Sequence, residues 1–185
     1  MILSAHQANF IPWIPYFDKM NKSDVFILMS NCQFEKNGYQ NRADVNMKWW
    51  TKPVESGTKL IKDKKYADGN SLLEVNTLWI LAIAKTLSID TKKIHSDFET
   101  EKKGTDRIIE LCKRYECDQY LTNPDAMNKY LDEKKMNDAG IEVLHHTCGY
   151  QKHTFEAMEE LGLEGTIKML KKEKETWLTK ISHSS

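Results

Sequence analysis

A histidine-containing segment lies where the first predicted strand ends and the first predicted helix begins. The residues from His6 to Trp13 read His-Gln-Ala-Asn-Phe-Ile-Pro-Trp and follow an apolar run at 1–5. In open parallel α/β sheets, ligands bind at this carboxyl end of the strands, and the free N–H groups of the next helix attract phosphate. We therefore predict that His6 contacts phosphate or acts as a general acid. The alternative is a turn histidine that is bonded to the backbone.

A second polar segment follows the second predicted strand, so we expect it at the same edge of the sheet. It contains Gln33, Lys36, Asn41 and Arg42. The two cationic side chains could neutralise an anionic substrate, and an arginine can bind a carboxylate or a phosphate through two parallel hydrogen bonds. The convergence of both segments on one edge favours a binding site over a plain surface loop.

Two further segments carry residue types that bind metals or phosphate. Their members are His145, His146, Cys148 and His153 in one segment, and Lys102, Lys103 and Thr105 in the other. The histidine and cysteine spacing matches no standard zinc finger, so we expect no metal site and interpret that segment as a polar loop. The lysine segment precedes a predicted helix, where it could bind phosphate, although its threonine could equally be only an N-cap.

The pattern of apolar residues predicts the elements that position these segments. A strand at 1–5, a helix at 10–22 and a strand at 24–30 form a βαβ unit, which requires a parallel sheet. Further strands are predicted at 45–52, 92–98, 119–122 and 141–145, and further helices at 71–87, 105–115, 125–138, 153–161 and 166–181. The fold class is therefore α/β.

We predict a single domain over residues 1–181, with a mostly parallel sheet flanked by helices and a frayed tail at 182–185. The helix at 71–87 is apolar nearly all round, which predicts a fully buried helix. The segment at 55–70 is rich in lysine and glycine and is expected to be a flexible loop.

The charge balance limits the class of partner. The chain has 185 residues, with 27 basic and 27 acidic side chains. A zero net charge argues against the basic footprint of a non-specific nucleic-acid binder, but it permits a small anion pocket. We see no signal peptide and no apolar run long enough to span a bilayer, so we expect a cytoplasmic protein with reduced cysteines.

The stretch from His6 to Arg42 resembles the WbqC-like protein family. That family has a strand ending in His-Gln-Pro, then Leu-Pro-Trp and Gly-Tyr-Phe, and later Gln-Phe, a lysine and Asn-Arg. The matching positions are His6, Gln7, Pro12, Trp13, Tyr16, Phe17, Lys19, Asp24, Gln33, Phe34, Lys36, Asn41 and Arg42. Ala8 and Pro15 depart from the pattern, and Ser30 and Asn31 replace an acidic pair.

The resemblance implies a transferase or ATP-dependent ligase of polysaccharide or O-antigen biosynthesis. Such an enzyme joins a small acyl or aminoacyl group to an amine or hydroxyl of a sugar nucleotide or a related acceptor. Its substrate would be a small anionic molecule, and ATP with magnesium would be its cofactor. A fainter resemblance to pantothenate synthetase implies a Rossmann-like, nucleotidyltransferase-like first βαβ unit in which Lys102 and Lys103 bind phosphate.

In this interpretation, the catalytic residues are His6, Lys36 and Arg42. The substrate-binding residues are Gln7, Asn9, Trp13, Tyr16, Gln33, Asn41 and Tyr150. Two alternatives remain open. One is a non-catalytic module whose aromatic side chains stack on a nucleotide or a nucleic acid, and the other is an enzyme that modifies a nucleic-acid base.

Overall fold

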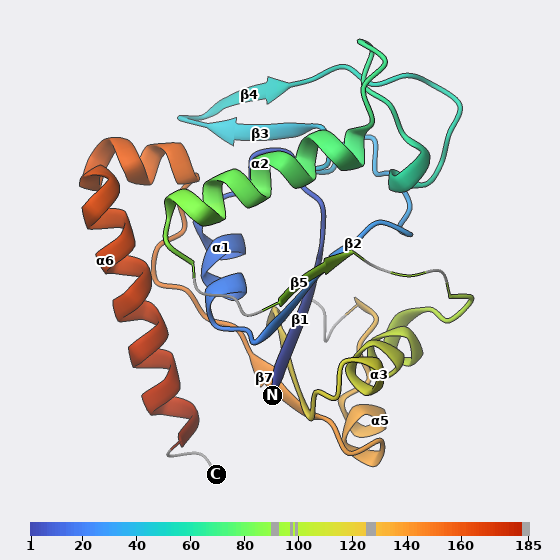
Figure 1. Cartoon of the computed structure of the whole chain (residues 1–185), viewed down its shortest axis with the longest axis vertical. Coiled ribbons are helices and arrows are strands. Elements are labelled where there is room, and N and C mark those ends of the chain that lie inside the picture. The colour runs from blue at the N-terminus through green and yellow to red at the C-terminus, as the bar shows by residue number, and fades with distance from the viewer. Residues whose placement is uncertain (90–92, 97, 99, 125–128, 183–185) are drawn as a thin grey trace.

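The computed structural model describes residues 1–89, 93–96, 98, 100–124 and 129–182, and Figure 1 shows the whole chain. The strands are β1 (Ile2–Gln7), β2 (Val25–Met29), β3 (Arg42–Val45), β4 (Lys48–Thr51), β5 (Lys93–Ser96), β6 (Gln119–Thr122) and β7 (Glu142–His145). The helices are α1 (Ile14–Asn21), η1 (Ile61–Asp63), α2 (Leu72–Thr86), α3 (Gly104–Arg114), α5 (Glu133–Asp138) and α6 (Thr154–Ser182).

The main sheet has five parallel strands in the order β5-β2-β1-β6-β7, which confirms the predicted Rossmann-like α/β fold. The strand order reverses between β1 and β6, so the segments that follow these two strands lead to helices on opposite faces of the sheet, α1 and α5. The crevice at such a point is the usual ligand site of an open α/β sheet. The segment that follows β1 starts at this switch point.

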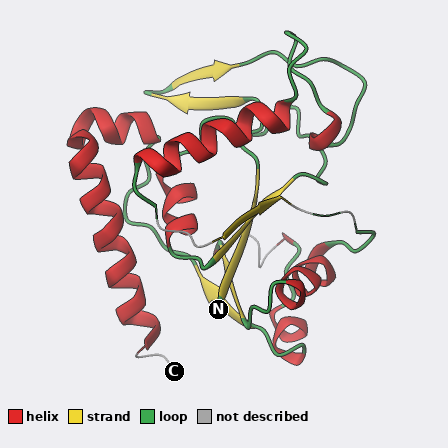
Figure 2. Ribbon diagram, in the orientation of Figure 1, coloured by secondary structure: helices red, strands yellow, loops and turns green. Residues whose placement is uncertain are grey.

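Helices cover both faces of the main sheet (Figure 2). On one face, α1, α2 and α6 pack against Phe26 and Leu28 of β2. On the other face, α3 and α5 pack against Val25 and Ile27 of the same strand. Because both faces are covered, β2 is apolar at successive positions, and this continuous apolar run is the pattern from which the strand was predicted.

The predicted strand at 45–52 is only partly confirmed, because β4 lies within it but the turn at 46–47 and the strand β3 before it were not predicted, and β3 and β4 form an antiparallel hairpin. The chain reverses at Asn46 and Met47, which have φ angles of 52° and 58°. Two successive positive φ angles are the mark of the hairpin turn that matches the twist of the strands. The usual sequence sign of this turn is Asn-Gly, and Met47 takes the place of the glycine, so the pattern did not reveal the turn.

The segment at 55–70, predicted to be a flexible loop, contains the short helix η1, and its Ile61 and Tyr66 side chains are fully buried against Leu72, while most of its other residues are exposed. The prediction of a fully buried helix at 71–87 is wrong. Helix α2 is only buried on one side, because Leu78 and Trp79 are 68% and 42% exposed. The apolar residues on every side of α2 therefore led to a wrong prediction, because one side of the helix faces solvent.

The remaining predicted helices are present, but two of them begin later than predicted. The helix predicted at 10–22 begins at Ile14 as α1. In the stretch predicted at 125–138, α5 begins after Asp132, whose side chain accepts a hydrogen bond from the Lys135 amide; positions 125–128 lie outside the described residues. Gly162 has a φ of 67° and divides α6 into two helical pieces, as predicted. Within the described residues, no helix combines the length and apolar character that crossing a membrane requires.

Asn76 of α2 ties the hairpin region to the end of β1. Its Nδ2 donates to the carbonyl oxygens of Ala8 and Gln40, both at 2.7 Å, and its Oδ1 accepts from the Tyr66 hydroxyl at 2.5 Å. The side chain is fully buried, so these bonds are made away from water. A buried polar group of this kind stabilises the fold only while all of its partners are satisfied.

We therefore expect Asn76→Ala to lower the free energy of unfolding by about 3 kcal/mol, because it leaves buried carbonyl groups without donors. Urea unfolding followed by circular dichroism would measure the change. Thr86→Ala is the matched control, because Thr86 lies in the same helix and makes only an exposed bond to its own helix backbone. Equal stability of the two variants would show that the Asn76 network does not hold the hairpin.

Candidate functional site

A pocket of about 270 Å³ lies at the carboxyl end of β1. Its walls come from the segment after β1, from the β3–β4 hairpin and from the start of α6. The polar and aromatic side chains that line it are Asn9, Phe10, Trp13, Tyr39, Asp44, Gln151, His153 and Glu156. Three segments that are far apart in the sequence therefore meet at this pocket.

The start of α6 fixes the segment that follows β1. His153 Nε2 donates to the Ile11 carbonyl oxygen at 2.8 Å, and the Thr154 hydroxyl donates to the Pro12 carbonyl oxygen at 2.7 Å. His153 Nδ1 accepts from the Phe155 amide at 3.2 Å, so both ring nitrogens are used. Burial lowers the pKa of His153, and the ring is a neutral link between the two segments.

The first turn of α1 is not a free anion site. The Ile14 amide donates to the Lys152 carbonyl oxygen at 3.0 Å, and the Tyr16 amide donates to the Trp13 carbonyl oxygen at 3.1 Å. These N–H groups are the donors that a phosphate at the helix N-terminus would need. The predicted phosphate contact at this position therefore has fewer donors than the sequence suggested.

Aromatic side chains form the open side of the pocket. Trp13 is 44% exposed and Tyr39 is 56% exposed. The centre of the Tyr39 ring lies 5.8 Å from the centre of the Trp49 ring. The Arg42 guanidinium lies over the same Trp49 ring, 4.1 Å from its centre. Arg42 also donates to the Asn37 carbonyl oxygen, while its buried Nε has no hydrogen-bonding partner among the described residues. An arginine donor is therefore held close to the aromatic rim.

Two carboxylates line the pocket, and the sequence prediction included neither. Glu156 accepts hydrogen bonds from the backbone amides of Asn46 and His153. Asp44 is exposed on β3, and its carboxylate has no hydrogen-bonding partner among the described residues. The only sequence sign of Asp44 was its position two residues after Arg42, at the start of a hairpin that the pattern did not reveal.

His6 lies with Gln7 and Tyr16 in a network at the end of β1. The His6 ring packs 4.7 Å from the Tyr16 ring, and the Tyr16 hydroxyl donates to the Gln7 carbonyl oxygen at 3.2 Å. The Gln7 side chain accepts from Gln40 Nε2 at 2.5 Å. Burial, aided by the charge of Lys19, lowers the pKa of His6 to about 3, so the imidazole is neutral at physiological pH. His6 is not among the residues that line the pocket.

The other predicted site residues lie in separate places. Among the described residues, the structure records no contact between any two of His6, Lys36 and Arg42, and their catalytic roles stay predictions. Lys36 and Gln33 are exposed, and Asn41 donates to the Lys52 carbonyl oxygen at 3.0 Å, where it supports the hairpin.

Tyr150 lies beside the start of α6 rather than in the pocket lining. Its hydroxyl donates to Glu160 at 2.6 Å, and burial, together with the charge of that carboxylate, raises its pKa to about 12. The hydroxyl is therefore a hydrogen-bond donor to the protein, and its substrate-binding role stays a prediction.

The predicted phosphate-binding residues lie at the start of α3, on the face of the sheet opposite α1 and α6 (Figure 1). The Thr105 hydroxyl donates to the Tyr130 carbonyl oxygen at 3.0 Å and accepts from the Asp132 amide at 2.9 Å. It therefore joins α3 to the segment before α5 and does not cap its own helix. Lys102 is exposed and lies 3.8 Å from Glu110, and Lys103 is exposed as well.

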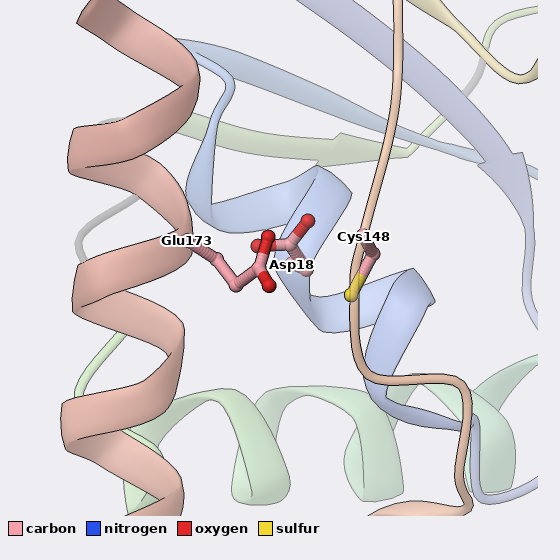
Figure 3. A group of neighbouring side chains, drawn as sticks. All are labelled: Asp18, Cys148 and Glu173. Carbon is pink, nitrogen blue, oxygen red and sulfur yellow. The ribbon is translucent and has the colours of Figure 1, made fainter.

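A buried charged cluster lies between α1, α6 and the loop after β7. Asp18, Cys148 and Glu173 place potential metal-binding atoms within 4.8 Å of one another (Figure 3). However, the Lys22 ammonium lies 2.5 Å from Asp18 and 3.8 Å from Glu173, so the protein supplies a cation of its own. Burial, aided by Asp18, raises the pKa of the Cys148 thiol to about 12. We interpret the cluster as an internal ion pair.

The four residues considered as zinc ligands do not come together. His146 donates through Nε2 to Asp18 at 2.8 Å, beside Cys148. His153 lies in the pocket wall, and His145 is exposed on β7. Among the described residues, these four do not form a group of neighbouring ligand atoms.

Comparison with known proteins gives two matches. The sequence pattern of the WbqC-like protein family matches residues 7–71 and 59–159. An uncharacterized protein of Mycobacterium tuberculosis, Rv1507c, is 25% identical over 181 aligned residues, which cover 74% of this chain and 78% of that protein. No solved structure gives a significant match.

The neutral state of His6 predicts a pH dependence of stability. In the unfolded chain His6 binds a proton below its ordinary pKa of 6.5, whereas in the folded protein it does so only near 3. Stability is therefore lost as the pH falls between these values, and His6 accounts for a loss of about 2 kcal/mol between pH 7 and pH 5. We expect urea unfolding to show that this loss is smaller by about that amount in His6→Phe.

His145→Gln is the control, because this histidine is exposed at the end of β7. It should keep the pH dependence of the parent protein. The interpretation of His6 as a neutral, buried ring fails if His6→Phe loses as much stability between pH 7 and pH 5 as the parent does.

Proposed function

Because this chain belongs to the WbqC-like protein family, we propose that it is a transferase that joins a small acyl or aminoacyl group to a sugar acceptor in polysaccharide biosynthesis. The observation that carries the proposal is the pocket at the end of β1. It combines two exposed aromatic rings with two carboxylates and two amide side chains. This combination suits a sugar ring, which has an apolar face and a rim of hydroxyl groups.

The size and lining of the pocket support one small ring as the ligand. Its volume of about 270 Å³ is just below the range of roughly 300–1,000 Å³ that is usual for drug-sized ligands. Trp13 and Tyr39 can stack on the apolar face of the ring. The Asn9 and Gln151 amides can exchange hydrogen bonds with its hydroxyl groups, because an amide both donates and accepts.

The chemistry that we propose is acyl transfer from an activated acyl donor. The acceptor nitrogen or oxygen attacks the carbonyl carbon, and the leaving group departs with the electron pair of the bond that breaks. Asp44 takes the proton from the attacking atom as the general base. An amine that arrives as its ammonium form gives up this proton before it attacks and passes a second proton to the leaving group afterwards. Arg42 stabilises the negative charge that develops on the donor. His6, being neutral, acts in this scheme by supporting the segment after β1 rather than by binding phosphate.

We favour a transferase over an ATP-dependent ligase. ATP with magnesium would supply the activation of the acyl group, but the residues do not fit an ATP site at the end of β1. The first N–H groups of α1 are already bonded within the protein. Lys102 and Lys103 directly precede α3, which packs on the opposite face of the sheet from α1. In the reaction that we propose, the acyl group is therefore already activated on the incoming donor.

The aromatic wall can be tested by binding. We expect Trp13→Ala to weaken the binding of the monosaccharide ligand at least about tenfold, or ~1.4 kcal/mol, because the stacking surface is lost. Isothermal titration with a panel of free monosaccharides and sugar nucleotides would measure it. Trp79→Ala is the matched control, because Trp79 is 42% exposed, close to the 44% of Trp13, and lies on α2 outside the pocket lining.

The catalytic role of Asp44 can be tested by product formation. Incubation with acyl thioester or aminoacyl donors and the sugars that bind should yield an acylated sugar, detected by mass spectrometry. We expect Asp44→Asn to lower the rate by about 10²-fold or more, because the general base is lost. Sugar binding without any product from the donor panel would instead identify a non-catalytic binding module.

A further inference from the structure

We propose that the pocket selects an amino sugar and holds its ammonium group between the carboxylates of Asp44 and Glu156. This inference rests on the proposed function and names the class of acceptor. The family resemblance left the acceptor group open between an amine and a hydroxyl. The charges and unused hydrogen-bonding groups of the pocket distinguish between them.

The pocket carries negative charge and no positive side chain. Asp44 and Glu156 line it, and among the described residues no lysine or arginine does. Of the nearest cations by sequence, Arg42 lies over Trp49 at the aromatic rim, on the side proposed for the donor rather than in the acceptor pocket, and Lys152 pairs with Glu160. His153 is neutral, because both of its ring nitrogens take part in hydrogen bonds to the backbone. If an anionic or neutral ring occupied the pocket, the negative charges of Asp44 and Glu156 would have no positive charge beside them.

Glu156 is held in place before any ligand binds. The Asn46 amide donates to its Oε1, and the His153 amide donates to its Oε2 at 3.4 Å. Each carboxylate oxygen can accept about two hydrogen bonds, so one acceptor position on each oxygen remains. Asp44 stands on the neighbouring β3 strand, and its carboxylate has no partner in the described part of the chain. Glu156 is therefore a hydrogen-bond acceptor that is held in place, and Asp44 is an acceptor that no described group of the protein uses.

A second, independent observation points to a ligand with hydrogen-bonding groups. The Asn9 side chain lines the pocket and is only 7% exposed. No hydrogen bond to its side chain occurs among the described residues. Its amide atoms are not among the fully buried polar atoms that lack a partner, so they are open to the pocket, where a ligand or water can bind them. Asn9 therefore supplies a donor and an acceptor for a ring hydroxyl on the inner side of the site.

These groups match an amino sugar better than a plain sugar. A protonated amine has three N–H donors and no acceptor, and hydrogen bonds between an ionised donor and an ionised acceptor are the stronger kind. An aromatic face within about 6 Å adds attraction for a cation, and Trp13 and Tyr39 provide such faces. N-acetylation would remove the charge and add bulk in a pocket of about 270 Å³.

Isothermal titration with glucosamine, glucose and N-acetylglucosamine, together with the galactose series, would test this inference. We expect the amino sugar of the preferred series to bind at least tenfold more tightly than both its hydroxyl and its N-acetyl counterparts. Asp44→Asn should reduce this preference at least fivefold, and so should Glu156→Gln, which keeps an amide oxygen to accept from the backbone. Glu159→Gln is the control, because Glu159 is exposed on the same helix outside the pocket lining.

The outcomes separate this inference from the proposed function. Equal binding of the three sugars would overturn amine selection while leaving a sugar pocket in place. A preference for the amino sugar that survives in both Asp44→Asn and Glu156→Gln would also overturn it, since the amine would then be held elsewhere. If none of the sugars binds to the parent protein, the proposed function fails and the inference fails with it.

Discussion

The pair of hydrogen bonds from His153 and Thr154 to the carbonyl oxygens of Ile11 and Pro12 is the contact on which the pocket depends. Each bond joins residues that are 142 positions apart in the sequence. The segment after β1 includes Ile11 at a φ of 43°, which an isoleucine adopts only under constraint. The bonds to α6 provide that constraint. They also bring Glu156 to the tip of the hairpin, so one contact positions two walls of the site.

Access from the pocket, rather than burial or an unmet hydrogen bond alone, separates the structural residues from the candidate functional ones. Lys22 and His146 both donate to Asp18 Oδ2, and Asp18 Oδ1 has no partner among the described residues, but the whole side chain is enclosed and no ligand can reach it. The donors and acceptors of the buried Asn76 and His153 side chains are met within the protein. Asp44 and Asn9 differ, because each lines the pocket without a hydrogen-bonding partner in the described part of the chain. This difference is why we place the chemistry at the pocket and a supporting role at the ion pair of α1.

The fold could be predicted from the sequence because parallel strands covered on both faces give unbroken apolar runs such as the one from Val25 to Met29. The segment after β1 was also located correctly, since its place at the end of the first strand follows from the βαβ unit. The hairpin was missed because its turn uses Asn46 and Met47 instead of Asn-Gly. Asp44 and Glu156 were missed with it, since a single carboxylate on a strand or a helix carries no sign of what it will face. The tertiary contact between the hairpin turn and α6 brings them to one pocket.

The central place of β1 in the sheet affects how the protein emerges from the ribosome. Of the described strands β1 is synthesised first, and it pairs with β2 on one side and with β6, which begins at Gln119, on the other. Until β6 has been made, one edge of β1 has no partner, although the first four residues of the strand are buried in the folded protein. An unpaired strand edge with exposed apolar residues is a site of aggregation. The pocket itself is completed later still, because its last wall begins at residue 151. The nascent chain therefore exposes an aggregation-prone edge well before it has a binding site, and rapid translation or chaperone binding over that interval would favour a good yield of the folded protein.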